Sequence, residues 1–169
     1  MTDSHRRCLE PVARERWADH PRFPDQALLL GSHENFRRIS KVLVAGISVA
    51  VRDDLFHRWQ AAMRSHEHYE EHKLYPFLRH RFGVKTAKLE AGHGALHAIE
   101  VELRRASAER DGASWATSMA QYDAVLHEHL RDEEDLVIPC LLALESSEFS
   151  AYYHGSMPSL LSESNRCAC

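Results

Sequence analysis

Two histidine-glutamate pairs with the same spacing are the residues of this chain best suited to chemistry. His66 is followed by Glu70, and His129 is followed by Glu133. Four residues make about one turn of an α-helix, so the two members of each pair share one helix face and can reach the same metal ion. The spacing therefore predicts two helix faces that bind metal.

The two pairs belong to an internal repeat with an offset of 129 − 66 = 63 residues. A second glutamate and a proline follow each pair at equal distances; they are Glu71 and Pro76 in one copy and Glu134 and Pro139 in the other. A chain with this many histidines and glutamates contains roughly one such pair by chance, so a single pair is weak evidence. Two pairs in register with a repeat are a much stronger indication of a site.

The elements that must position these residues are helices. Apolar residues recur at alternating steps of three and four along most of the chain, which predicts amphipathic helices. We expect four of them, at about 24–50, 53–82, 85–110 and 114–144. Short connections between long helices favour an all-α fold, an up-down-up-down antiparallel four-helix bundle, with the two prolines bending their helices at the same relative place.

The rest of the chain is expected to form short extensions of this one domain. Residues 1–24 are read as an N-terminal extension, 25–146 as the bundle, and 147–169 as a short C-terminal helix, around Phe149, Tyr152 and Tyr153, followed by a loose tail. A chain of 169 residues is the size of a single ordinary domain.

Composition excludes several classes of partner and favours a cytoplasmic protein. The formal net charge is −4, with basic and acidic residues interspersed, so we expect neither nucleic acid nor a membrane surface as a partner. No stretch has the length of a membrane span, and the first residues lack the apolar core of a signal peptide. The four cysteines have no disulfide-framework spacing; they are Cys8, Cys140, Cys167 and Cys169.

The helix faces predicted to point inward carry seven metal-ligating side chains. They are His33, His66, Glu70, His93, His97, His129 and Glu133. Burying two carboxylates among five imidazoles costs several kcal/mol unless a cation pairs with them, on the order of magnitude known for unpaired buried charges. Nitrogen and oxygen ligands without thiolate favour iron, manganese or zinc, and seven ligands exceed the needs of one tetrahedral ion. The set fits two ions.

Over about 27–144 this pattern resembles the hemerythrin-like, or HHE cation-binding, domain family. Its motif is a lone histidine, then His-x-x-x-Glu, His-x-x-x-His and His-x-x-x-Glu, and these seven residues match it in order. The resemblance implies two iron ions with an oxo or hydroxo bridge, and O2, peroxide or nitric oxide as small ligands. His93, His97 and His129 would hold one iron, His33 and His66 the other, and Glu70 and Glu133 would bridge them.

One position departs from the oxygen carriers of this family. The residue after the histidine of the second helix is aromatic there and closes the gas pocket, whereas here it is Glu67. Glu67 is interpreted as an additional ligand, as a proton donor to bound oxygen, or as a residue facing a neighbouring helix and water. Tyr122 is interpreted as a relay for protons or electrons or as a plain core aromatic, and apolar pocket residues are expected at Leu126, Phe36 and Met63.

Three functions fit these observations. The first is a di-iron oxidoreductase that reduces peroxide or activates O2, with Glu67 or Tyr122 as relay. The second is a module that reversibly binds or senses O2, nitric oxide or iron without turnover, since no substrate cleft or cofactor motif is evident. The third is a bundle that stores stray metal in variable amounts. Neither an electron donor nor an organic substrate is identified by the sequence.

Overall fold

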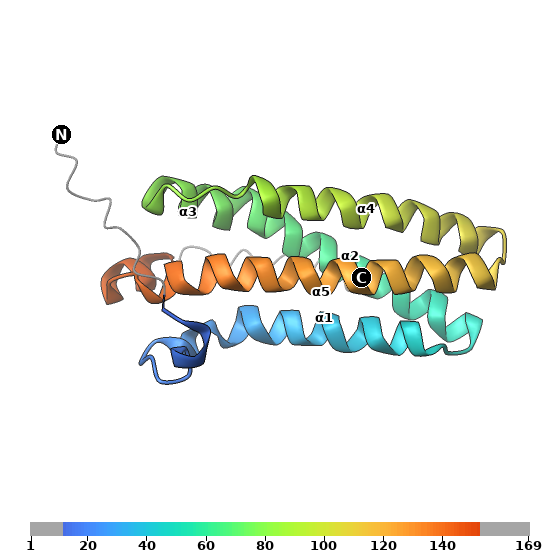
Figure 1. Cartoon of the computed structure of the whole chain (residues 1–169), viewed down its shortest axis with the longest axis horizontal. Helices are drawn as coiled ribbons and strands as arrows, with labels where there is room; N and C mark the ends of the chain where they lie inside the picture. Colours follow the sequence, from blue (N-terminus) through green and yellow to red (C-terminus); the bar gives the residue numbers. More distant parts are fainter. Residues whose placement is uncertain (1–11, 153–169) are drawn as a thin grey trace.

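The computed structural model describes residues 12–152, and over this range it consists of helices joined by short connections, without strands (Figure 1). Its α-helices are α1 (Ala27–Ala45), α2 (Val49–Tyr69), α3 (Tyr75–Phe82), α4 (Ala87–Ala108) and α5 (Gly112–Leu142). The long helices lie side by side along one axis, and α5 packs against both α1 and α4. The expected all-helical bundle is confirmed.

Helix boundaries follow the local chemistry at their ends. Gly46, with φ 84°, ends α1 earlier than expected, so α2 begins at Val49 rather than near residue 53. Gly83 ends α3 in the left-handed region at φ 70°, where glycine has no Cβ penalty. The carboxylate of Asp111 accepts hydrogen bonds from the backbone N–H groups of Ala113 and Ser114 and so caps α5.

The second long helix widens into a π-helical turn, Glu70–Leu74, which connects α2 to α3. The backbone N–H of Tyr75 donates to the carbonyl of Glu70, five residues back. Pro76 lies in the first turn of α3; it supplies no N–H, and its ring needs room beside the preceding turn, which the wider π-helical turn provides. Pro139 instead lies inside the uninterrupted α5, so the two halves of the repeat treat their prolines differently.

Apolar side chains form two main clusters along the bundle, and a polar layer separates them. The first cluster includes Phe36, Met63 and Leu126, and the second includes Leu74 and Val137. Along each of α1, α2, α4 and α5, the expected metal ligands lie between the residues of one apolar cluster and those of the other, or next to them. The helix periodicity thus places a buried polar layer between two apolar cores.

Segments outside the long helices cover one end of the bundle. Trp17, near the 3₁₀ turn Arg14–Arg16, packs with Ile138 and Leu142 of α5. Residues 146–152 are helical, and Phe149 and Tyr152 pack against the second apolar cluster. Tyr153, expected in the same short helix, lies outside the described residues, as do Cys8, Cys167 and Cys169.

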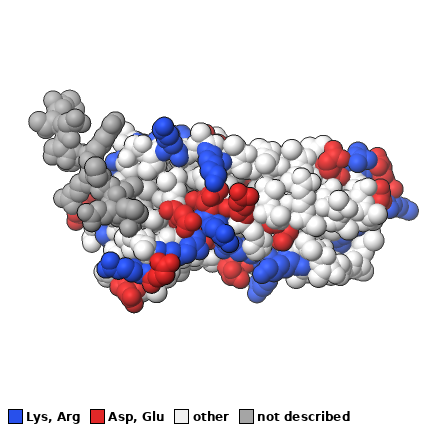
Figure 2. Space-filling view, in the orientation of Figure 1, with Lys and Arg blue, Asp and Glu red and all other residues white. Residues whose placement is uncertain are grey.

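The surface of the described part carries mixed charges. Figure 2 shows acidic and basic side chains interspersed on the face it presents, without a broad area of one sign. Ion pairs such as Arg14 with Asp135 and Lys88 with Asp132 account for part of this mixture. Between residues 12 and 152, no helix is long and apolar enough to cross a bilayer.

Candidate metal centre

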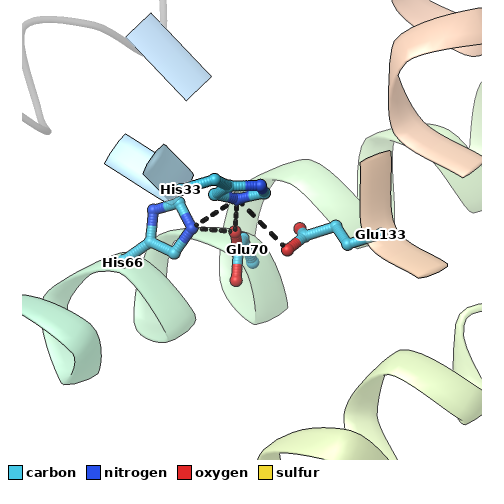
Figure 3. Close-up of side chains that lie close together, drawn as sticks. All are labelled: His33, His66, Glu70 and Glu133. Carbon is cyan, nitrogen blue, oxygen red and sulfur yellow. Dashed lines mark hydrogen bonds and ion pairs between the residues drawn. The ribbon is translucent and has the colours of Figure 1, made fainter. Parts of the chain in front are cut away.

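Four side chains converge in the polar layer from three parts of the bundle (Figure 3): His33 from α1, His66 and Glu70 from α2 and its π-helical turn, and Glu133 from α5. One ligand atom from each lies within 4.8 Å of the others. The Nε2 atom of His66 is 2.6 Å from Oε1 of Glu70 and 3.0 Å from Nε2 of His33. Glu133 Oε2 is 3.5 Å from the same His33 nitrogen. The four side chains therefore present nitrogen and oxygen donors to one point.

A second group joins Glu70 to His93 of α4 and His129 of α5. The Nε2 atom of His93 lies 3.4 Å from Oε2 of Glu70, and the rings of His93 and His129 are 4.6 Å apart. Glu70 thus turns one carboxylate oxygen toward each group. A carboxylate shared in this way is suited to bridging two cations.

The pKa values of the two central carboxylates, Glu70 and Glu133, are shifted in opposite directions. Burial works to raise the pKa of Glu70, but His66, His33 and His93 outweigh it and hold that pKa well below its ordinary value. Burial and the negative charge of Glu70 raise the pKa of Glu133 well above its ordinary value. These opposite shifts have one cause, since two carboxylates this close ionise together only at a high energetic cost when no cation lies between them.

The pKa shifts of His129 and His93 are also compatible with metal binding. Burial, followed by the nearby positive charge of His93, lowers the pKa of His129 to about 4, so this imidazole is neutral at pH 7 and keeps a free lone pair. Burial lowers the pKa of His93, yet the carboxylates of Glu70 and Glu71 outweigh it and raise the value to about 9. A cation at His93 would therefore displace a proton.

The unsatisfied polar atoms of the layer support a cation as the missing partner. Both oxygens of Glu70, Oε2 of Glu133 and Nε2 of His93 are buried without a hydrogen-bond partner among the described residues. Such atoms are rare in folded proteins, and each costs about 1–3 kcal/mol when left unpaired. Their close approach without hydrogen-bond geometry is what lone pairs aimed at a common cation produce. The residues present therefore fit bound metal ions.

Tyr75 is a site residue that the sequence patterns did not indicate. Its hydroxyl donates to Oε1 of Glu133 over 3.2 Å, and its ring stacks on that of His93. The π-helical turn is responsible, because its wider hydrogen-bonding ring places residue 75 almost over residue 70, on the face that points into the layer. The repeat gave no signal, since the matching position on α5 is Ile138.

His97 differs from the other expected ligands. Its side chain is 48% exposed, and its Nε2 atom lies 2.7 Å from Oε2 of Glu67 rather than against Glu70 or Glu133. His97 lies one turn along α4 from His93, at the edge of the helix, where its side chain pairs with the carboxylate of Glu67. The structure thus joins six of the seven expected ligands in two groups, and ligation by His97 stays a prediction.

Glu67 itself is buried, with a relative exposure of 4%, between α2 and α4. Desolvation raises the pKa of Glu67, although the charges of His93 and His97 oppose this effect. Glu67 faces the neighbouring helix α4, as one interpretation had it, but the part of that interpretation that placed it toward water is wrong, because the side chain is buried and pairs with His97. Its Oε1 atom has no hydrogen-bond partner within the described range.

The expected pocket residues lie in the first apolar cluster, directly beside the site. Phe36, Met63 and Leu126 are buried one turn from His33, His66 and His129 respectively, and the Phe36 ring is 5.1 Å from that of His66. Tyr122 is fully buried, and its ring packs edge-on against Trp59. Burial and the charges of Glu100 and Glu67 raise the pKa of Tyr122 well above its ordinary value, so its hydroxyl stays protonated.

Gly92 permits the close approach of α4 to His129. A Cβ atom built there would lie 2.5 Å from Nδ1 of His129, closer than any ordinary contact. We expect Gly92→Ala to displace the imidazole and to lower both thermal stability and the amount of metal bound. Gly94→Ala is the matched control, because a Cβ there meets nothing within 4 Å and should stabilise α4 by roughly 1 kcal/mol. Thermal unfolding and metal analysis of both variants test this. Equal unfolding temperatures and equal metal contents of Gly92→Ala and Gly94→Ala would contradict it.

The fold and the site define a helical protein with a buried histidine and glutamate cluster suited to binding metal. Residues 25–141 match the family model described as the hemerythrin HHE cation binding domain. This match covers most of the chain, which therefore belongs to that family, and the resemblance noted in the sequence is confirmed. Neither the curated proteins nor the solved structures compared with the chain gave a match.

Proposed function

We propose that the protein is an up-down-up-down antiparallel di-iron bundle that reduces or activates O2 or peroxide. The observation that carries the proposal is the position of Glu70, which belongs to both ligand groups and offers one oxygen to each. His33, His66 and Glu133 would complete the site of one ion, and His93 and His129 that of the other. Two redox-active ions side by side would supply electrons to a small oxidant.

The chemistry of the donors is compatible with iron. The two groups contain imidazole and carboxylate ligands and no thiolate, and this set suits iron or manganese in addition to zinc. The group with His93 and His129 has fewer donors than the group with His33, so coordination positions remain there for a small ligand. We expect that side of the centre to receive the oxidant.

Turnover is favoured over simple storage by the pair formed by Glu67 and His97. Reduction of O2 or peroxide consumes protons, and a proton must enter the buried layer from solvent. His97 is half exposed, Glu67 is buried, and they are 2.7 Å apart. Together they form a route of two side chains from the surface toward His93, whose charge acts on Glu67.

Reversible binding of O2 or nitric oxide is the second candidate. It is supported by the apolar wall of Met63 and Leu126, which have relative exposures of 1% and 0% and would limit water around a bound gas. A dry pocket slows proton-coupled loss of bound oxygen. The two candidates differ in whether peroxide is consumed.

The test begins with metal analysis of the protein purified from iron-supplied cells. Reduced, iron-loaded protein is then exposed to O2 and to hydrogen peroxide, with ascorbate supplied as the electron donor for repeated reduction, while its visible spectrum and peroxide consumption are followed. Sustained consumption, reduced in Glu67→Gln but not in the exposed control Glu90→Gln, would support the oxidoreductase. An oxygenated spectrum that reverses under vacuum would support the second candidate, and variable, loosely held metal would rule out both.

A further inference from the structure

Glu134, the second member of its Glu-Glu pair, contacts a histidine from another helix. Its Oε1 atom lies 3.1 Å from Nδ1 of His33, and both side chains are buried. The opposite ring nitrogen of His33, Nε2, faces the metal site and lies 3.5 Å from Glu133 Oε2. Since Glu134 accepts the proton of Nδ1, it leaves the Nε2 lone pair free for a metal ion.

Glu71 makes the corresponding contact in the other half of the repeat. Its Oε1 atom lies 2.8 Å from Nδ1 of His93 on α4, and Nε2 of His93 points to Glu70 at 3.4 Å. The two glutamates of each pair therefore have the same arrangement in both copies of the repeat. The first glutamate enters the metal site, and the second reaches outward to a histidine that a different helix contributes.

We propose that Glu71 and Glu134 are positioning residues for the metal centre, each fixing the tautomer and ring orientation of one histidine ligand. The inference rests on the proposed function, because it assigns these glutamates a role toward the same two ions. Hydrogen-bonded partners of this kind raise the basicity of a ligating imidazole and hold it in place.

The two positioning residues differ in how firmly they are held. Glu134 also pairs with Arg37 at 2.7 Å and with Arg14 at 2.9 Å, so its carboxylate is clamped from α1 and from the N-terminal segment. The side chain of Glu71 is 38% exposed, so water competes with His93 for its carboxylate. We therefore expect an ion at His93 to exchange faster than one at His33. Arg14 connects the segment before the bundle to Glu134, which contacts His33.

Substitutions at the two glutamates test the proposal. Glu71→Ala is expected to weaken one bound ion by about 10- to 100-fold and to leave the other nearly unchanged, and Glu134→Ala should do the same for the other ion. Glutamine at either position keeps an acceptor for Nδ1–H and should restore most of the affinity. Glu128→Ala, an exposed neighbour of His129, is the control.

Affinities are measured for Fe²⁺ and Zn²⁺ by competition with a chelator, and long-range ¹H–¹⁵N NMR of the zinc-loaded protein reports which ring nitrogens carry protons. Loss of the Nδ1 proton signal of His93 in Glu71→Ala and its return in Glu71→Gln would support the proposal. Unchanged affinity and ring signals in Glu71→Ala would overturn it, and thermal unfolding of this variant checks that the fold is retained. A wild-type chain that binds no ions would overturn the proposed function itself.

Discussion

Replacing Glu70 by alanine is expected to abolish binding of both ions, whereas replacing a single histidine ligand should affect mainly one. Glu70 is the residue common to the two ligand groups, and its two oxygens face His66 and His93. Its low pKa means that it already carries the negative charge that a cation needs. We expect the loss of affinity at each ion to exceed the roughly 10- to 100-fold effect of removing a supporting residue.

Glu100→Ala is the matched control for this substitution. Glu100 has the same relative exposure of 0% as Glu70 but pairs with Arg64 and Arg104 outside the two ligand groups. Elemental analysis and titration with Fe²⁺ measure both variants against the wild type. Retention of two ions by Glu70→Ala would contradict a shared bridging carboxylate, and equal metal loss in both variants would point to unfolding instead.

Removing the metal is expected to lower the unfolding temperature strongly. A ligand that binds only the folded state, at about 1,000 times its dissociation constant, stabilises that state by about 4 kcal/mol. For a domain of this size each kcal/mol shifts the midpoint by roughly 2–4 °C, so the two ions together should contribute on the order of 20 °C. The buried unpaired oxygens of Glu70 and Glu133 are the physical source of this dependence.

Differential scanning calorimetry of loaded and chelator-treated protein measures the shift. The same treatment of Glu70→Ala should change its midpoint very little, because that variant holds no ions to lose. If the wild type unfolds at the same temperature with and without metal, the polar layer is stable by itself and the ions are not part of the folded structure.

Much of the fold and of the site could be predicted because both depend on which helix face is buried. Period 3.6 placed His33, His66 and His129 on the same faces as Phe36, Met63 and Leu126, and the structure buries these faces together. The helix ends were less predictable. Gly46 ends α1 by adopting a positive φ, and a glycine within a helical pattern does not reveal this in advance.

The parts that could not be predicted depend on contacts between helices. Glu67 is one step around α2 from His66, and only the position of α4 decides whether it meets His97 or water. Likewise, identical spacing precedes Pro76 and Pro139, but only the first produces a π-helical turn. Tyr75 enters the site through that turn, so a period count based on a uniform α-helix assigns it to the wrong face.

The separation of the apolar side chains into two clusters has a consequence for local opening of the molecule. The clusters around Trp59 and Leu78 meet across polar groups that lack hydrogen-bond partners, so without bound ions we expect each end of the bundle to open as a separate cooperative unit. Bound ions would then couple the two units. Amide hydrogen exchange should then slow most in the middle of α5, the helix that runs through both.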